Sequence, residues 1–239
     1  MSLLPAIVIL AFAGFIQGLT GFGFGLVSMA LLPLALPFKE ALVVVAALNV
    51  AACATTLFAT RRHFSWRRGA GVALGSCVGV PIGFYALVHL DSQLLLHALG
   101  ALMCFFAVSE LFLARYFRVK FPEWAGFPVG VVSGSLGGAF NIGGPPVIAY
   151  AYSQPWAKEE IVATLQLVFG ASAILRLALV GQSGLLHADL LHLALLALLP
   201  MLAGIVLGGH LLQRVPREPL KFAVFVFLLT MGAKYLFIT

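Results

Sequence analysis

Two glycine-rich stretches carry most of the polar side chains that could bind a ligand in an otherwise apolar chain. The first is QGLTGFGFG at 17–25 and the second is GSLGGAFNIGGPP at 134–146. Glycine and proline disfavour helix interiors, so each stretch predicts a break between two helices. A helix that begins after a break presents unpaired backbone N–H groups and the positive end of its dipole, which suits an anion. The sequence therefore predicts anion binding at helices that begin near Phe22 and Pro145.

Neutral donors and glycine backbone around the two breaks form most of the candidate binding site. Such donors can hold an oxyanion at the end of a helix dipole and release it more readily than a full ion pair would. The alternative is that these polar groups only form hydrogen bonds between helices. The candidate site consists of Gln17, Thr20, Gly21, Gly23, Asn49, Asn141, Gly143, Gly144, Pro145, Gln166 and Arg176.

Arg176 stands out because it lies inside an apolar segment. An arginine within a membrane span costs at least ~2.5 kcal/mol on insertion scales, so by default it marks function. It follows the start of its segment by about 17 residues, roughly 26 Å of helix. The side chain could then either serve an anion pathway or extend to the outer lipid headgroups. Glu110 is the carboxylate that could couple transport to protons. The alternative is that it forms an ion pair with nearby Arg115 at the membrane surface.

The composition is that of an integral membrane protein. Apolar residues make up 62% of the chain and charged residues 9%, with a mean hydropathy of +1.09. The chain has room for about seven to ten apolar segments and for no sizeable soluble domain. The net charge of +6 comes from short basic clusters between these segments, a pattern typical of contact with lipid headgroups and not with nucleic acid. The cysteines and histidines show no ligand spacing, so neither a metal nor a cofactor is expected.

The apolar segments predict an all-α polytopic membrane protein built from two inverted repeats, residues 1–120 and 121–239. Each repeat is expected to hold a broken or re-entrant hairpin of short helices followed by three long transmembrane helices. Placing Gly18 on Gly134 also places the Leu48-Asn49 pair close to Leu165-Gln166. The short segments are predicted at 3–19, 22–37, 124–138 and 145–155, and the long ones at 40–60, 69–89, 93–116, 159–180, 188–213 and 217–238.

The basic residues predict the orientation. If each short pair enters and leaves the membrane on one side, most lysines and arginines share one side and Lys39 lies opposite. The positive-inside rule makes the shared side cytoplasmic, which places both termini outside a cytoplasmic (inner) membrane. The residues on the shared side are Arg61, Arg62, Arg67, Arg68, Arg115, Arg118, Lys120, Lys158, Arg214, Arg217 and Lys221.

Four stretches of the chain resemble the TauE/SafE sulfite exporter family. They are GFIQGLTGFGFGLVSMALL at 14–32, LNVAACATTL at 48–57, GSLGGAFNIGGPPVIAYAYS at 134–153 and LQLVFGASAILRL at 165–177. The resemblance covers nearly the whole chain, and its most specific part is the NxGGPP-like stretch. It implies transport of sulfur-containing anions such as sulfite, sulfonates or sulfoacetate across the cytoplasmic membrane. It implies the class of solute and not its identity.

The residues and the resemblance together predict a secondary transporter that exports a small sulfur-containing oxyanion bound at mid-membrane between the helix breaks. No enzymatic activity is expected, because no paired acid and base or metal set lies at membrane depth. An anion channel and an accessory membrane subunit without transport activity are the alternatives. The expected partners are a small anionic solute and membrane lipids, without nucleic acid, and a homo-oligomer is compatible with the sequence.

Overall fold

The computed structural model describes residues 3–21, 23–60, 66–113, 121–211 and 217–237, and every element there is a helix. Phe22, near the predicted start of a half-helix, lies outside the described residues. Six of the basic residues that predict the orientation also lie outside them, namely Arg61, Arg62, Arg115, Arg118, Lys120 and Arg214.

One order of elements occurs twice along the chain: a helix, a short helix and three long helices. The first set is α1 (Leu3–Thr20), α2 (Phe24–Leu31) with the 3-10 turn η1 (Leu32–Leu34), α3 (Phe38–Thr60), α4 (Trp66–His89) and α5 (Ser92–Val108), which continues as the π-helical turn η3 (Ser109–Leu113). The second set is η4 (Glu123–Ala125), α6 (Gly126–Phe140), α7 (Gly144–Ser153), α8 (Lys158–Gln182), α9 (Ala188–Leu211) and α10 (Arg217–Phe237). The all-α prediction is confirmed, and both glycine-rich stretches break the helices as expected.

Six helices in the described part of the chain are long and apolar enough to cross a membrane: α1, α3, α4, α5, α8 and α9. The sequence predicted α1 as a short segment, 3–19, and the helix has 18 residues, one more than that. It packs on α9 through Gly14 and Gly18. Helix α10 has 21 residues, close to the predicted segment 217–238. The chain is thus a multi-pass membrane protein.

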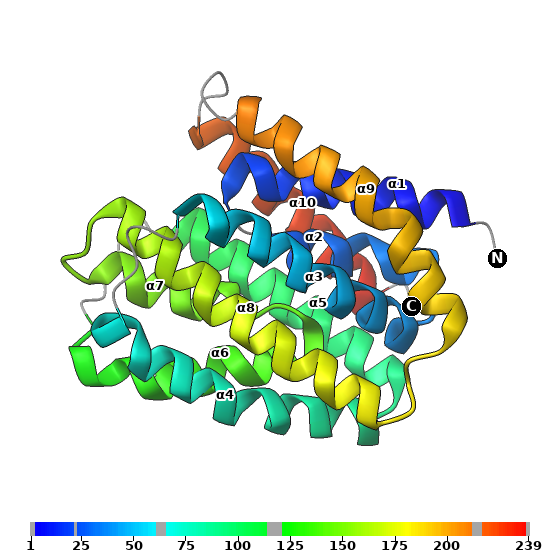
Figure 1. The fold of residues 1–239 in the computed structure, drawn as a ribbon, viewed down its shortest axis with the longest axis horizontal. Helices are drawn as coiled ribbons and strands as arrows, with labels where there is room; N and C mark the ends of the chain where they lie inside the picture. The colour runs from blue at the N-terminus through cyan, green and yellow to red at the C-terminus, as the bar shows by residue number, and fades with distance from the viewer. Residues whose placement is uncertain (1–2, 22, 61–65, 114–120, 212–216, 238–239) are drawn as a thin grey trace.

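Two helix pairs pack so closely that their backbones touch, α4 with α6 and α1 with α9. A Cβ added to Gly79 would lie 2.1 Å from the Val131 carbonyl oxygen, and one added to Gly204 would lie 2.4 Å from that of Ala11. The two pairs form opposite sides of the bundle in Figure 1, with α3 and α8 between them. Each pair joins the first helix of one set to the fourth helix of the other, so the same contact occurs twice.

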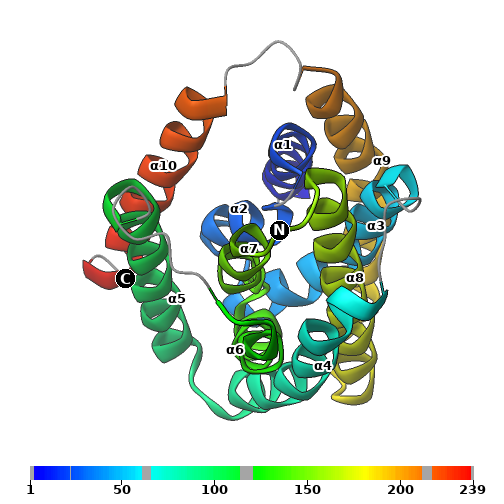
Figure 2. The same cartoon turned by 90° about the vertical axis from the view of Figure 1, so that its left-hand side faces the viewer.

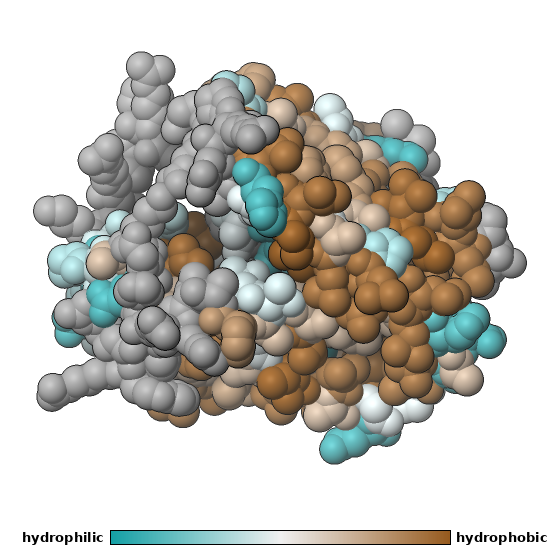
Figure 3. Space-filling model, turned by 45° about the horizontal axis from the view of Figure 1, so that its top comes forward, coloured by the Kyte–Doolittle hydropathy of each residue, from teal (hydrophilic) through white to brown (hydrophobic). Residues whose placement is uncertain are grey.

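Apolar side chains cover much of the outer surface, as expected where the bundle faces lipid. Leu199, Phe58 and Phe105 are among the most exposed of them. Figure 3 shows a broad apolar region on one face, with hydrophilic residues mostly toward its margins. Lipid chains solvate this surface as well as the interior of the bundle does, so apolar side chains gain nothing by moving inside. The interior can therefore be occupied by the polar residues of the helix breaks.

Candidate functional site

The first break, between α1 and α2, is a turn that only glycine adopts without strain. Gly21 and Gly23 have φ values of +80° and +106°. The side chain of Gln17 closes the turn, because its Oε1 accepts a hydrogen bond from the N–H of Phe24 at 3.0 Å. Thr20 donates from Oγ1 to the carbonyl of Ile16 one turn earlier, at 2.8 Å. One of the N–H groups that begin α2 is therefore already paired within the protein.

The second break, between α6 and α7, is built differently. Asn141 ends α6 in the left-handed conformation, with φ of +60°, and its N–H donates to the Gly137 carbonyl at 3.0 Å. Ser133 donates from Oγ to the carbonyl oxygen of Gly143. Helix α7 begins Gly-Pro-Pro, so among its first four residues from Gly143 onward only Gly143 and Gly144 carry an N–H.

The two breaks lie against each other at the centre of the bundle. A Cβ added to Gly25 in α2 would lie 2.3 Å from the carbonyl oxygen of Asn141, so the two chain segments are in backbone contact there. In Figure 2, α7 is drawn in front of α2 near the middle of the view, with the longer helices around them. We call the region where these segments meet the junction; it comprises 17–28, 133–145 and the side chains that bond to them.

Two amide side chains tie the halves together at the junction. Gln166 of α8 donates from Nε2 to the Gly21 carbonyl at 2.6 Å, and Asn141 donates from Nδ2 to the Leu42 carbonyl of α3 at 3.1 Å. Both side chains are buried. Leu42 is about 6 Å along α3 from its first residue, so the second break lies nearer to that end of the bundle than to the other.

Arg176 is buried at the second break. Its side chain is 2% exposed and donates from Nη1 to the Gly137 carbonyl oxygen, which also accepts the N–H of Asn141. This position rules out the extension to lipid headgroups that the sequence left open. The guanidinium lies at the C-terminal end of α6, where the negative end of the helix dipole stabilises a cation.

Four buried side-chain atoms have no hydrogen-bond partner in the described part of the chain, and all belong to residues of the junction. They are Ser28 Oγ, Asn141 Oδ1, Gln166 Oε1 and Arg176 Nε. Leaving a buried polar group unpaired costs about 1–3 kcal/mol, and more for a charged group. Such a cluster is typical of a place where a ligand or ordered water completes the pairing.

The structure brings together most, but not all, of the predicted site. Gln17, Gly21 and Gly23 shape the first break, Asn141, Gly143, Gly144, Pro145 and Arg176 the second, and Gln166 bonds from α8 to the first. Among the described residues, we find no hydrogen bond that connects Asn49 to these side chains. Its Oδ1 accepts the thiol of Cys53 in the same helix, at 3.7 Å.

Two glycines with a role at the junction are absent from the predicted site residues. Gly25 provides the close approach to Asn141, and Gly137 provides the carbonyl that Arg176 and Asn141 share. A signal for Gly25 exists in the sequence, because GFGFG contains one more glycine than the turn at 21–23 requires. No local signal marks Gly137, because it acts only through its backbone oxygen.

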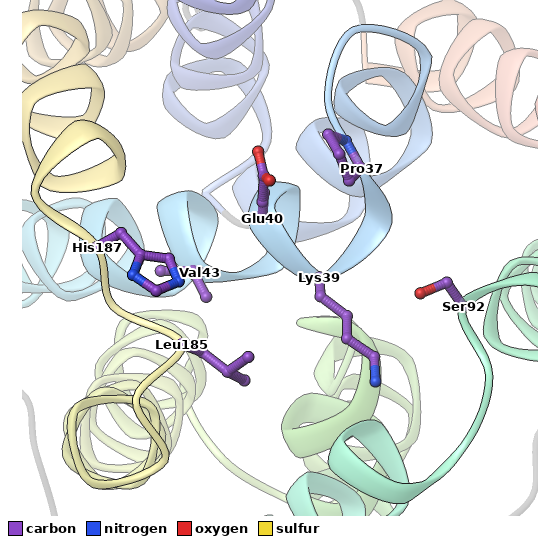
Figure 4. Close-up of a pocket in the computed structure, with 7 residues that line it drawn as sticks. All are labelled: Pro37, Lys39, Glu40, Val43, Ser92, Leu185 and His187. Carbon is purple, nitrogen blue, oxygen red and sulfur yellow. The ribbon is translucent and has the colours of Figure 1, made fainter.

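A pocket of about 300 Å³ lies beside the second break, where α3, α5 and α9 begin. It is lined by Pro37, Lys39, Glu40, Val43, Ser92, Leu185 and His187 (Figure 4). No residue of the candidate site lines it. Phe38, which lies between Pro37 and Lys39 of the pocket in the sequence, packs its ring against that of Phe140, the neighbour of Asn141, with centroids 6.4 Å apart.

Comparisons with known proteins identify the family to which this chain is similar. The family profile "Sulfite exporter TauE/SafE" matches residues 6–235. The chain is also 31% identical over 215 residues to a protein of Cupriavidus necator named "Probable sulfite/organosulfonate exporter TauE", covering 86% of this chain and 84% of that protein. No solved structure matches the chain.

Proposed function

The chain belongs to the sulfite exporter TauE/SafE family, and from this premise we propose that it carries sulfite or an organosulfonate out of the cell across the cytoplasmic membrane. As a member of the family it is a transporter and not an enzyme. The substrate class and the outward direction are carried over from the family and from the relative in Cupriavidus necator. The membrane potential, negative inside, favours this direction by about 2.3 kcal/mol per charge per 100 mV.

The anion is proposed to bind at the junction, and the buried charge of Arg176 is the observation that carries this proposal. Its hydrogen-bond partner is a backbone carbonyl and not a carboxylate, and its Nε is unpaired. A buried charge without a counter-ion is costly, so an oxyanion that pairs with it stabilises the site. The N–H of Gly143, just before α7, lies near it and suits the same ligand.

The two halves are proposed to have opposite orientations, with both termini outside the cell. Reciprocal packing of α1 with α9 and of α6 with α4 supports two equivalent halves. In this orientation the pocket around Lys39 opens to the outside. Its lining residue Val43 follows Leu42, whose carbonyl accepts the hydrogen bond of Asn141. Alternating access would then expose the junction to each side in turn as one half moves against the other.

Counterflow of labelled sulfite in proteoliposomes tests the function and the site together. Wild-type protein should give saturable exchange, and Arg176→Met should lower it more than 100-fold, because losing the partner of a buried charge costs about 3–5 kcal/mol. Arg176→Lys should retain part of the activity. Ser172→Ala is the matched control, because Ser172 is on the same helix and donates only to the Val168 carbonyl of that helix, at 2.7 Å.

Each alternative gives a different result in this assay. Undiminished counterflow by Arg176→Met would refute the assignment of the anion to the junction. Flux that does not saturate would indicate a channel, and no flux from folded wild-type protein would indicate an accessory subunit.

A further inference from the structure

We propose that the transported anion carries a hydrogen-bond donor of its own, a hydroxyl or ammonium group, in addition to its acidic oxygens. This inference rests on the proposed function and concerns the same site. Its basis is the type of the unpaired atoms at the junction: Arg176 Nε can only donate, whereas Asn141 Oδ1 can only accept. A fully deprotonated oxyanion without a donor group would satisfy the first and leave the second unpaired.

The identity of the unpaired acceptors follows from their neighbours. The Nδ2 atom of Asn141 faces the Leu42 carbonyl and the Nε2 atom of Gln166 faces the Gly21 carbonyl. Turning either amide over would set two oxygens against each other, so the free atom must be the oxygen in both cases. Both side chains are more than nine-tenths buried, and bulk water does not reach these oxygens.

Arg176 and Asn141 meet at one backbone oxygen. The Nη1 of Arg176 and the N–H of Asn141 both donate to the carbonyl oxygen of Gly137. The side chains that carry the unpaired Nε and Oδ1 therefore belong to two residues that are neighbours at the second break. In the proposed complex, a sulfonate with a hydroxyl two carbons away places its acidic oxygens at Arg176 and its O–H at Asn141.

Gln166 Oε1 offers a second acceptor for the same donor group at the other break. Ten residues separate Gln166 from Arg176 on α8, about 15 Å of helix, so one small ligand does not reach both at once. The two acceptors are thus successive contacts along a path through the junction. A ligand without a donor group would leave each of them unpaired in turn.

The test compares two sulfonates of nearly equal size, 2-hydroxyethanesulfonate and propane-1-sulfonate, which differ by a hydroxyl in place of a methyl group. Their binding to purified full-length protein is measured by calorimetry and by competition with sulfite counterflow. The hydroxylated sulfonate should bind about five- to tenfold more tightly, the effect of one additional hydrogen bond. The ratio in wild-type protein decides the proposal even where a variant fails to fold.

Variants assign the effect to an atom. Asn141→Gly suits a residue at positive φ and removes the acceptor, so the ratio should fall to about one. Arg176→Met should weaken both sulfonates equally. Ser172→Ala is the control outside the junction, because its Oγ donates only to the Val168 carbonyl within α8, at 2.7 Å, and the ratio should persist.

Equal affinity of the wild-type protein for the two sulfonates would overturn this inference, because water would then be the partner of the acceptors. Transport of the anion would still stand in that case. Failure of sulfite and both sulfonates to bind would instead overturn the proposed function, and this inference with it.

Discussion

The two helix breaks occupy equivalent places in the two halves, yet the residue that bridges each break acts in the opposite sense. The alignment that places Gly18 on Gly134 places Gln17 on Ser133. Gln17 accepts the N–H of Phe24, whereas Ser133 donates to the carbonyl of Gly143. The bridge at the first break therefore occupies an N–H group at the start of the short helix, whereas the bridge at the second break occupies a carbonyl oxygen. The bridge at the second break thus leaves the N–H groups at the start of its short helix to the proposed anion.

The distribution of charge follows the same division. The alignment that places Leu48 on Leu165 places Ala59 on Arg176, and among the described residues only the second break has a buried cation beside it. Both breaks take part in bonds between the halves, the first through the Gly21 carbonyl and the second through Asn141. Two halves with the same order of helices thus differ in charge at their breaks and not in whether they join the halves.

The largest effect should come from the place where the two breaks touch. Gly25→Ala puts a Cβ 2.3 Å from the Asn141 carbonyl, a backbone atom that cannot turn away. The two breaks must then move apart, which should lower the free energy of unfolding by about 3 kcal/mol or more. Counterflow should be lost as well, because the junction is no longer assembled. Gly144→Ala is the matched change at the start of α7, where the added Cβ meets only Ile148 at 3.5 Å and Phe169 at 3.8 Å.

Thermal unfolding in detergent, together with sulfite counterflow, measures this difference. The midpoint temperature should fall clearly for Gly25→Ala. For Gly144→Ala the free energy of unfolding should change by no more than about 1 kcal/mol, because alanine favours a helix more than glycine does. If both variants behaved alike, contact between the breaks would not be what holds the junction together.

The sequence predicted the breaks because glycine and proline act locally. Composition and the glycine-rich stretches were enough for an all-α membrane protein and for the place of the breaks. They did not predict that Gly14 and Gly18 would pack on the backbone of α9, because nothing in residues 3–20 alone specifies which helix meets that surface.

The contacts within the candidate site could not be predicted, because they join residues far apart in the sequence. The bond from Gln166 to Gly21 spans 145 positions and that from Asn141 to Leu42 spans 99. Helices in lipid are apolar on all sides, so their pattern does not say which face meets which neighbour. Arg176 was ambiguous for the same reason, since its position along α8 allowed both a buried and a headgroup location.

An intermediate effect is expected from the two bridging residues. Gln17→Leu leaves the N–H of Phe24 buried without a partner, at a cost of about 1–3 kcal/mol. Ser133→Ala leaves only a carbonyl oxygen short of one bond, and about 1 kcal/mol or less should be lost. Urea unfolding of the two variants in the same detergent measures the difference. A greater loss for Ser133→Ala would mean that the second break, and not the first, depends on its bridge for stability.

The smallest effect should come from Asn49, the counterpart of Gln166 in the first half. Asn49 Oδ1 accepts a weak thiol bond within α3, so Asn49→Ala should change the free energy of unfolding by less than about 0.5 kcal/mol and counterflow by less than twofold. Gln166→Ala removes a bond between the halves and should cost about 1 kcal/mol. Loss of counterflow in folded Asn49→Ala would show that the first half also binds the anion. This variant removes only a weak thiol bond, so a structural effect like that of Gln166→Ala could not explain the loss. The contrast between a second break that holds the charge and a first break that does not would then be wrong, and the two breaks would have to be treated as equivalent parts of one site.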